Sequence, residues 1–226
     1  MDFNDRQYYL NRECTWLSFN QRVLRESTCE DNPLLERLRF IAISCSNLDE
    51  FFMIRVAGLK HLIESGVHHH DISGLTPQGQ MDAVSRIAHD QMRDIDRCLK
   101  ATLKELTTHG IHFVRPEDLD AKQELWLTEF FEREIYPVVT PMGIDPSHPF
   151  PFLTSKSLAV HLKRPEDKEI RLAILPVPVS VLGRLIKVPE LQHYLYLEDI
   201  LSYFAERFFT GYEILETTPF RVTRDA

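Results

Sequence analysis

The side chain best suited to recognising a small molecule is the carboxamide of Asn47, in the run Ser44-Cys45-Ser46-Asn47. A carboxamide carries a donor and an acceptor side by side, so it can pair with a partner that presents both groups or accept from a single amine. The run consists of weak helix formers inside a helical pattern, which predicts a bend or an opening. Glu50, three residues on, gives a second interpretation in which Asn47 caps the next helical segment. Spacing alone favours the cap.

Three charged residues share this segment, namely Asp49, Glu50 and Arg55. They could line a pocket at Asn47 or brace its side chain. Charged residues in a helical pattern more often form ion pairs on the surface, and their spacing specifies no single pairing. We therefore expect structural ion pairs here.

Histidines occur in two places that could do chemistry. His68-His69-His70-Asp71 has side chains that bind metals, but adjacent residues in a loop cannot all converge on one ion without a particular fold. A solvated loop is the preferred interpretation. His148, flanked by Pro146 and Pro149, could act as an acid or base near neutral pH.

Neither a phosphate loop nor a metal site is predicted. The sequence contains no G-x-x-x-x-G-K-[ST] and no G-x-G-x-x-G, the glycine-rich patterns that cradle phosphates. Its cysteines are scattered without a C-x-x-C pair, so neither a zinc knuckle nor a disulfide framework is indicated. They are Cys14, Cys29, Cys45 and Cys98.

Apolar residues recur at spacings of three and four from about residue 13 to residue 109, which predicts helices. A first helix is expected near Thr15 to Thr28. Asn32 can cap a second helix with Pro33 at its first position, and Thr76-Pro77 opens a long third one. The predicted apolar stripes are Trp16, Phe19, Val23 and Leu24, then Leu34, Leu38, Ile41, Cys45, Leu48 and Phe52, then Met81, Val84, Ile87, Ile95, Leu99 and Leu103. The aromatic residues in these stripes are expected to be core.

Strand patterns appear after Gly110. Strands are expected at residues 111–114, 157–162, 170–175, 184–188 and 212–222, with helices at 118–136 and 197–209. The predicted fold is therefore mixed, with an all-α helical bundle over residues 1–109 followed by an α+β domain over residues 110–226.

Composition predicts a folded globular protein, because 43% of the 226 residues are hydrophobic and 27% are charged. The 26 Lys and Arg against 34 Asp and Glu give a formal charge of -8. Such a surface repels polyanions, so nucleic acid is not an expected partner. The polar start Met1-Asp2-Phe3-Asn4-Asp5-Arg6 and the lack of a long apolar run predict a cytoplasmic protein without a transmembrane segment.

Three stretches together resemble the N-terminal and head domains of the polyphosphate kinase family that works through a phosphohistidine. The resemblance runs in family order from residue 10 to residue 226, and its most specific part is Ser46 to Lys60. Departures are Cys14-Thr15 and the histidines at 68–70. The stretches are LNRECTWLSFNQRVL at 10–24; NPLLERLRF at 32–40 with SNLDEFFMIRVAGLK at 46–60; and DPSHPFPFL at 145–153 with GYE at 211–213 and FRVTRDA at 220–226.

The resemblance implies reversible transfer of the terminal phosphoryl group of ATP to polyphosphate, with Mg²⁺, through a phosphorylated histidine in two C-terminal domains. Asn47 matches the position that contacts ATP in this family, which reverses the preference for a cap. The sequence stops at Ala226, so we expect a truncated chain with no catalytic residue and no metal ligand of its own, inactive alone. His148 is then assigned to shaping a proline-rich turn.

The head domain of the family mediates subunit contacts, so the resemblance also implies a homo-oligomer. A rival interpretation is a non-catalytic assembly or regulatory module. The abrupt ending within a family segment argues against this rival.

Overall fold

The computed structural model describes residues 5–145, 147, 149–166 and 169–225 of the chain. The chain divides into two compact units, one of Met1–Thr108 with Thr223–Ala226 and one of His109–Val222. The first is helical and the second combines helices with two sheets. The predicted fold class, an all-α bundle followed by an α+β domain, is confirmed.

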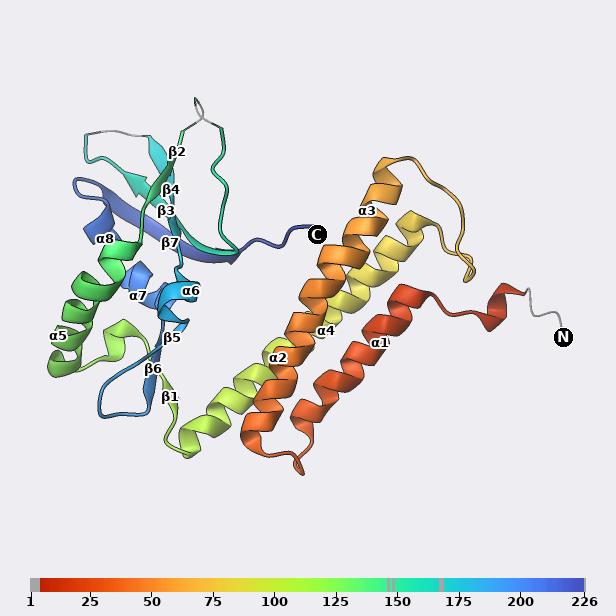
Figure 1. Cartoon of the computed structure of the whole chain (residues 1–226), viewed down its shortest axis with the longest axis horizontal. Coiled ribbons are helices and arrows are strands. Elements are labelled where there is room, and N and C mark those ends of the chain that lie inside the picture. The colour runs from red at the N-terminus through yellow and green to blue at the C-terminus, as the bar shows by residue number, and fades with distance from the viewer. Residues whose placement is uncertain (1–4, 146, 148, 167–168, 226) are drawn as a thin grey trace. The chain divides into compact units, whose positions relative to one another are not determined.

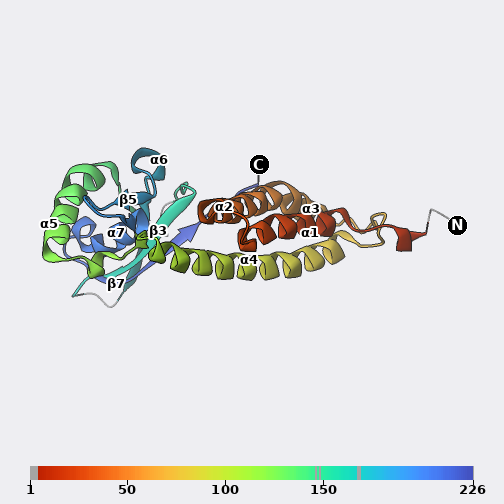
Figure 2. The same ribbon diagram turned by 90° about the horizontal axis from the view of Figure 1, so that it is seen from below.

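The first unit is built from antiparallel helices. These are α1 (Arg12–Arg25), α2 (Leu34–Phe51), α3 (Ala57–Glu64) and α4 (Pro77–Thr108). A π-helical turn, Phe52–Val56, joins α2 to α3, so that the two helices follow one line (Figure 1). α1 and α4 both pack against α2, and α4 runs along the whole bundle (Figure 2).

Local signals set the ends of these helices. Asn11 caps α1, because its Oδ1 accepts from the backbone N–H of Cys14 at 2.9 Å. α3 ends at Glu64 and is closed by a Schellman motif, in which Gly66 has a φ of 69° that suits a residue without Cβ. The predicted start of the third helix at Thr76-Pro77 is confirmed, since Thr76 Oγ1 accepts from Gly79 N.

The predicted capping role of Asn32 is wrong. α2 begins at Leu34 with Pro33 as its N-cap residue and has no side-chain cap. The carboxamide of Asn32 instead donates to the backbone oxygen of Glu26 at 2.9 Å and to its side chain at 3.2 Å. This side chain therefore closes the turn between α1 and α2 instead of opening α2.

Most residues of the predicted apolar stripes lie in the bundle core or pack against it, and the clearest exception is in α1. In α1 the buried residues are Leu17, Asn20 and Leu24, whereas Phe19 is 48% exposed. The buried stripe of α1 includes the polar residue Asn20, whereas the predicted stripe contained only apolar residues and therefore included the adjacent Phe19. The apolar core of the bundle comprises Leu17, Leu24, Ile41, Leu48, Phe51, Leu59, Val84 and Ile95.

The second unit contains two sheets. The smaller has the strand order β1-β6-β5, formed by His112–Phe113, His193–Tyr196 and Leu185–Lys187, with β1 parallel to β6. The larger has the order β2-β4-β3-β7 and is antiparallel. Its strands are Met142–Ile144, Ile170–Pro176, Lys156–Lys163 and Glu213–Arg221.

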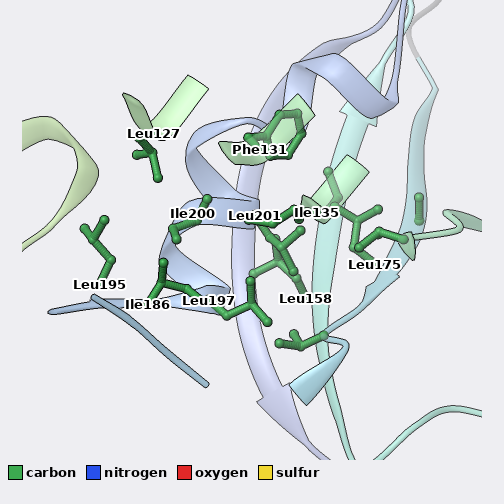
Figure 3. Close-up of a cluster of buried hydrophobic side chains, with 14 of the residues drawn as sticks. Leu127, Phe131, Ile135, Leu158, Leu175, Ile186, Leu195, Leu197, Ile200 and Leu201 are labelled. Carbon is green, nitrogen blue, oxygen red and sulfur yellow. The ribbon is translucent and has the colours of Figure 1, made fainter. Parts of the chain in front are cut away.

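Helices pack against these sheets and share one apolar core with them. They are α5 (Ala121–Phe130) with the π-helical turn Phe131–Ile135, α6 (Val179–Leu182), α7 (Leu197–Tyr203) and α8 (Ala205–Phe208). Phe131 and Ile135 pack with Leu158 of β3 and Ile200 of α7 in one apolar core (Figure 3). Phe131 is fully buried and stacks on Phe204, with ring centroids 4.3 Å apart.

Two strands were not predicted from the sequence, β2 and β6. Each is short, and each exists because of a partner far along the chain. His193 of β6 lies opposite His112 of β1, and Met142 of β2 lies opposite Ile174 of β4. The equally short β1 and β5 were predicted, so length alone does not explain why these two strands were missed.

Candidate functional site

Each long helix of the bundle places one polar residue in its buried stripe. These are Asn20 in α1, Ser44 in α2 and Gln91 in α4, with exposed fractions of 0%, 1% and 3%. Each lies three residues after one buried apolar residue and four before the next. The flanking pairs are Leu17 and Leu24, Ile41 and Leu48, and Ala88 and Ile95. The three helices therefore share one polar layer within an apolar core.

Hydrogen bonds connect this layer. The amide of Asn20 donates through Nδ2 to the backbone oxygen of Ser44 at 3.2 Å and to Oε1 of Gln91 at 3.3 Å. Gln91 in turn donates through Nε2 to the backbone oxygen of Leu17. Ser44 Oγ is buried without a hydrogen-bond partner in the described part of the chain. The amides thus tie α1, α2 and α4 together through groups that are costly to leave unpaired.

Asn47 lies at the outer end of this network. Its Nδ2 donates to Oδ1 of Asn20 at 3.0 Å, and the residue is half-buried. Within the described residues, its Oδ1 accepts no hydrogen bond. One of the two N–H groups of the Asn47 amide is therefore held by Asn20, which leaves Oδ1 and the second N–H without a hydrogen bond in the described structure.

Both local interpretations of Asn47 drawn from the sequence are wrong. α2 runs unbroken from Leu34 to Phe51, so there is no bend at Ser44–Asn47 and no helix start for Asn47 to cap. Packing of α2 between α1 and α4 outweighs the weak helix propensity of the run. The irregular turn comes later, at Phe52–Val56.

Both units match models of a single protein family. The polyphosphate kinase N-terminal domain matches residues 9–114, and the polyphosphate kinase middle domain matches residues 122–226. The chain belongs to the polyphosphate kinase family. Its helical unit corresponds to the N-terminal domain of that family and its second unit to the middle domain.

Similar proteins agree with this assignment. The chain is 45% identical to a polyphosphate kinase of Halalkalibacterium halodurans and 42% identical to one of Staphylococcus epidermidis, in both cases over its full length. It spans about a third of the length of these relatives, 33% and 31%. The crystal structure of polyphosphate kinase from Porphyromonas gingivalis superimposes with a TM-score of 0.84 at 31% identity, covering 96% of this chain and 33% of that one.

The charged residues that follow Asn47 in this polyphosphate kinase segment do not hold its side chain. In the described structure, Asn47 hydrogen-bonds with Asn20 and with none of Asp49, Glu50 and Arg55. Glu50 is exposed, and Arg55 lies in the π-helical turn. The residue that braces Asn47 was missed in the sequence. That residue is Asn20. A polar residue that lies three residues after one apolar residue of a helical stripe and four before the next could have indicated it, and Ser44 and Gln91 have the same spacing.

The histidine loop of the N-terminal domain is organised by Asp71. His68–His70 are exposed, whereas Asp71 accepts hydrogen bonds from Ser73 at 2.7 Å, from the N–H of Leu75 at 2.9 Å and from Asn11 at 2.8 Å. Burial raises the pKa of this carboxyl, but these hydrogen bonds outweigh burial and leave the pKa below its ordinary value. Asp71 therefore ties the loop to the start of α1 as an anion.

Metal binding has no support in the described ranges. Those residues contain no group of three or more His, Cys, Asp or Glu placed to hold an ion. His148 lies outside the described residues. In the same described part of the chain, no helix has the length and apolar character needed to cross a membrane.

The middle domain contains a charged cavity of about 370 Å³. Lys156 of β3 and Arg221 of β7, which lie opposite each other in the sheet, line it together with Arg184 and Glu198. Arg184 Nε donates to Glu198 Oε1 at 2.8 Å, and this bond raises the pKa of Arg184 despite burial. Glu198 Oε2 is buried without a hydrogen-bond partner in the described structure. The Arg184 guanidinium therefore balances a carboxylate that is largely withdrawn from water.

Proposed function

We propose that this chain forms the N-terminal and middle domains of an enzyme that reversibly transfers the terminal phosphoryl group of ATP to inorganic polyphosphate. The observation that carries the proposal is the end-to-end match to proteins named polyphosphate kinase, at 45% identity for one of them. Identity at this level over the whole of this chain, which spans 33% of that relative, supports the same enzyme class for the intact gene product.

Within this enzyme, the N-terminal domain contributes Asn47 to the adenine side of the ATP site. Support comes from the geometry of the half-buried residue, which donates one N–H to Asn20 and leaves its Oδ1 without a hydrogen bond in the described structure. Ile43, one helical turn earlier on α2, is 39% exposed and offers apolar surface on the same face. A planar base needs such a combination of apolar surface and one directed polar group.

The phosphoryl chemistry is carried, in this proposal, by residues outside these 226. The sequence has no glycine-rich phosphate loop, and the described residues hold no group of three or more His, Cys, Asp or Glu placed to hold an ion. A phosphohistidine and its Mg²⁺ would then come from C-terminal domains of the enzyme. The present chain binds and orients the nucleotide, and by itself it is expected to have no kinase activity.

The middle domain mediates subunit contacts in a cytoplasmic homo-oligomer. Support comes from Phe150 and Phe152, which are 63% and 82% exposed. Two large aromatic side chains exposed so close together are characteristic of surfaces that a partner covers.

The test is polyphosphate synthesis by the purified product of the gene that encodes this chain. With ATP and Mg²⁺, we expect polyphosphate and ADP to form, and ATP to form again from ADP and polyphosphate. The isolated chain serves as the inactive control. An intact gene product that assembles but transfers no phosphate in either direction would reject the kinase and favour a non-catalytic assembly or regulatory module.

A further inference from the structure

We infer that Asn20 and Gln91 lock the carboxamide of Asn47 with its oxygen outward, so that the site selects purines bearing an amino group at C6. This inference rests on the proposed contact between Asn47 and the base. It adds two positioning residues and a direction for the hydrogen bond, neither of which follows from the contact itself.

The direction is set by backbone carbonyls, because a carbonyl oxygen can only accept a hydrogen bond. Asn20 faces the oxygen of Ser44, so the side of its amide that points there must be Nδ2. Gln91 faces the oxygen of Leu17, so it must present Nε2 to that oxygen. Two independent carbonyls thus fix the orientation of two amides, a choice that is otherwise ambiguous for Asn and Gln.

The orientation of Gln91 fixes that of Asn20, and the orientation of Asn20 fixes that of Asn47. With Nε2 directed at Leu17, Gln91 Oε1 is left to accept from Asn20 Nδ2. With Nδ2 engaged twice, Asn20 presents only its Oδ1 to Asn47. Asn47 must meet this oxygen with Nδ2, and therefore its Oδ1 faces away from the core.

A reversed Asn47 would be unfavourable. Its Oδ1 would then meet Oδ1 of Asn20 at hydrogen-bond distance, and the fully buried Asn20 would lose the donor for its acceptor. Buried acceptors without a partner are strongly disfavoured. Because Asn20 cannot turn without breaking its bonds to Ser44 and Gln91, reversal of one amide would disrupt the layer.

An outward acceptor distinguishes purines by the group at C6. Adenine carries an amino group there, which can donate to Asn47 Oδ1, whereas hypoxanthine and guanine carry an oxygen, which can only accept and would have to move away from Oδ1 to reach the remaining N–H of the amide. Sites that must hydrogen-bond a substrate group reject analogues that lack it, because a polar group is left unpaired. The amide network therefore favours ATP over ITP and GTP.

The first test leaves the protein unaltered and varies the nucleotide. Steady-state kinetics of the intact gene product would be compared for ATP, ITP and purine riboside triphosphate, which has only hydrogen at C6. A locked acceptor predicts kcat/KM in the order ATP, then purine riboside triphosphate, then ITP, with ATP at least about tenfold above ITP, a factor that corresponds to about 1.4 kcal/mol. An amide free to rotate would let ITP exceed the C6-unsubstituted analogue, and that order would overturn the inference.

The second test removes the lock. Asn20→Leu keeps the size of the side chain but has no acceptor for Asn47, so the preference for ATP over ITP is expected to fall about tenfold, mainly through KM. Asn20→Asp retains an acceptor for Asn47 Nδ2 and is expected to keep the preference at a cost in stability. Gln21→Leu is the matched control, since Gln21 is an amide on the same helix that donates to Asp94 and not to the network.

Asn47→Ala distinguishes the contact between Asn47 and the base from the lock on its orientation. If it raises the KM for ATP while a folded Asn20→Leu protein keeps the wild-type preference, the lock is rejected and the base contact stands. If Asn47→Ala leaves the KM for ATP unchanged, the contact is rejected and the lock with it. Thermal denaturation of each variant identifies any protein that has lost its fold, and for such a variant the nucleotide series on the unaltered protein decides.

Discussion

The indole of Trp16 stacks on the ring of Phe51, with ring centroids 4.7 Å apart and an angle of 17° between the planes. Trp16 lies one turn before Asn20 in α1, and Phe51 lies one turn after Asn47 in α2. The stack is therefore the apolar neighbour of the Asn20–Asn47 hydrogen bond. It packs α1 against α2 one helical turn from the level where the amides meet.

Phe51→Ala is expected to destabilise the helical unit by about 3–5 kcal/mol, because Phe51 is 1% exposed and its loss leaves a cavity beside Trp16. Urea denaturation of the chain in a Trp126→Phe background measures this, since Trp16 is then the only tryptophan. Phe19→Ala, at a residue 48% exposed, is the control and should cost within about 1 kcal/mol. Equal effects of the two substitutions would contradict the buried stack.

Asp71→Asn is expected to lower stability by about 1 kcal/mol at pH 7, because the carboxylate accepts from Leu75, Ser73 and Asn11. The folded-state pKa of Asp71 is lowered, so its contribution is complete above the unfolded pKa of about 3.9 and disappears as the pH falls through the folded value. The difference in unfolding free energy should therefore close below about pH 4. Urea denaturation from pH 7 to pH 3 measures it.

Asp82→Asn provides the control for this pH series. Asp82 is exposed on α4 and accepts from Gln78 at 2.8 Å within the same helix. Its substitution should change stability by no more than about 0.5 kcal/mol at any of these pH values. A gap for Asp71→Asn that stayed constant down to pH 3 would reject a role for its charge.

Arg184→Met is expected to destabilise the middle domain by about 1–3 kcal/mol, because it leaves the largely buried Glu198 without its partner. Adding Glu198→Gln should restore part of the loss, since the unpaired charge is then removed. Fluorescence of Trp126 in a Trp16→Phe background follows this domain. Lys122→Met is the control, since its ion pair with Glu190 at 3.4 Å is exposed and should contribute less than about 0.5 kcal/mol.

The paired substitution Phe150→Ser and Phe152→Ser is expected to reduce the assembly state of the intact gene product. These side chains are 63% and 82% exposed, so their replacement should leave the fold of the domain intact. Light scattering coupled to size-exclusion chromatography gives the mass. Leu125→Ser, at an α5 residue 62% exposed, is the control for loss of surface apolarity. An unchanged mass in the paired variant would place the subunit contact elsewhere.

Local pattern was sufficient for the larger elements. Apolar residues at spacings of three and four predicted the helices of the bundle. Thr76-Pro77 predicted the start of α4, because the capping hydrogen bond joins residues only three apart. The long strands β3, β4 and β7 were also recognisable, since each carries at least seven residues of strand pattern. The short β6 was not, although its partner β1, 81 positions away from His112 to His193, was expected.

The sequence by itself determined the family and the helical and mixed units, because motifs and periodicity are carried by neighbouring residues. It offered Asn47 as a site residue only through the family resemblance. Only the tertiary structure decided that Asn47 lies inside an unbroken helix and that Asn20 holds it. The bond from Asn20 to Gln91 joins residues 71 apart, and the direction of every amide depends on carbonyls brought close by packing. Hydrogen-bond direction is a property of that packing, and no local pattern contains it.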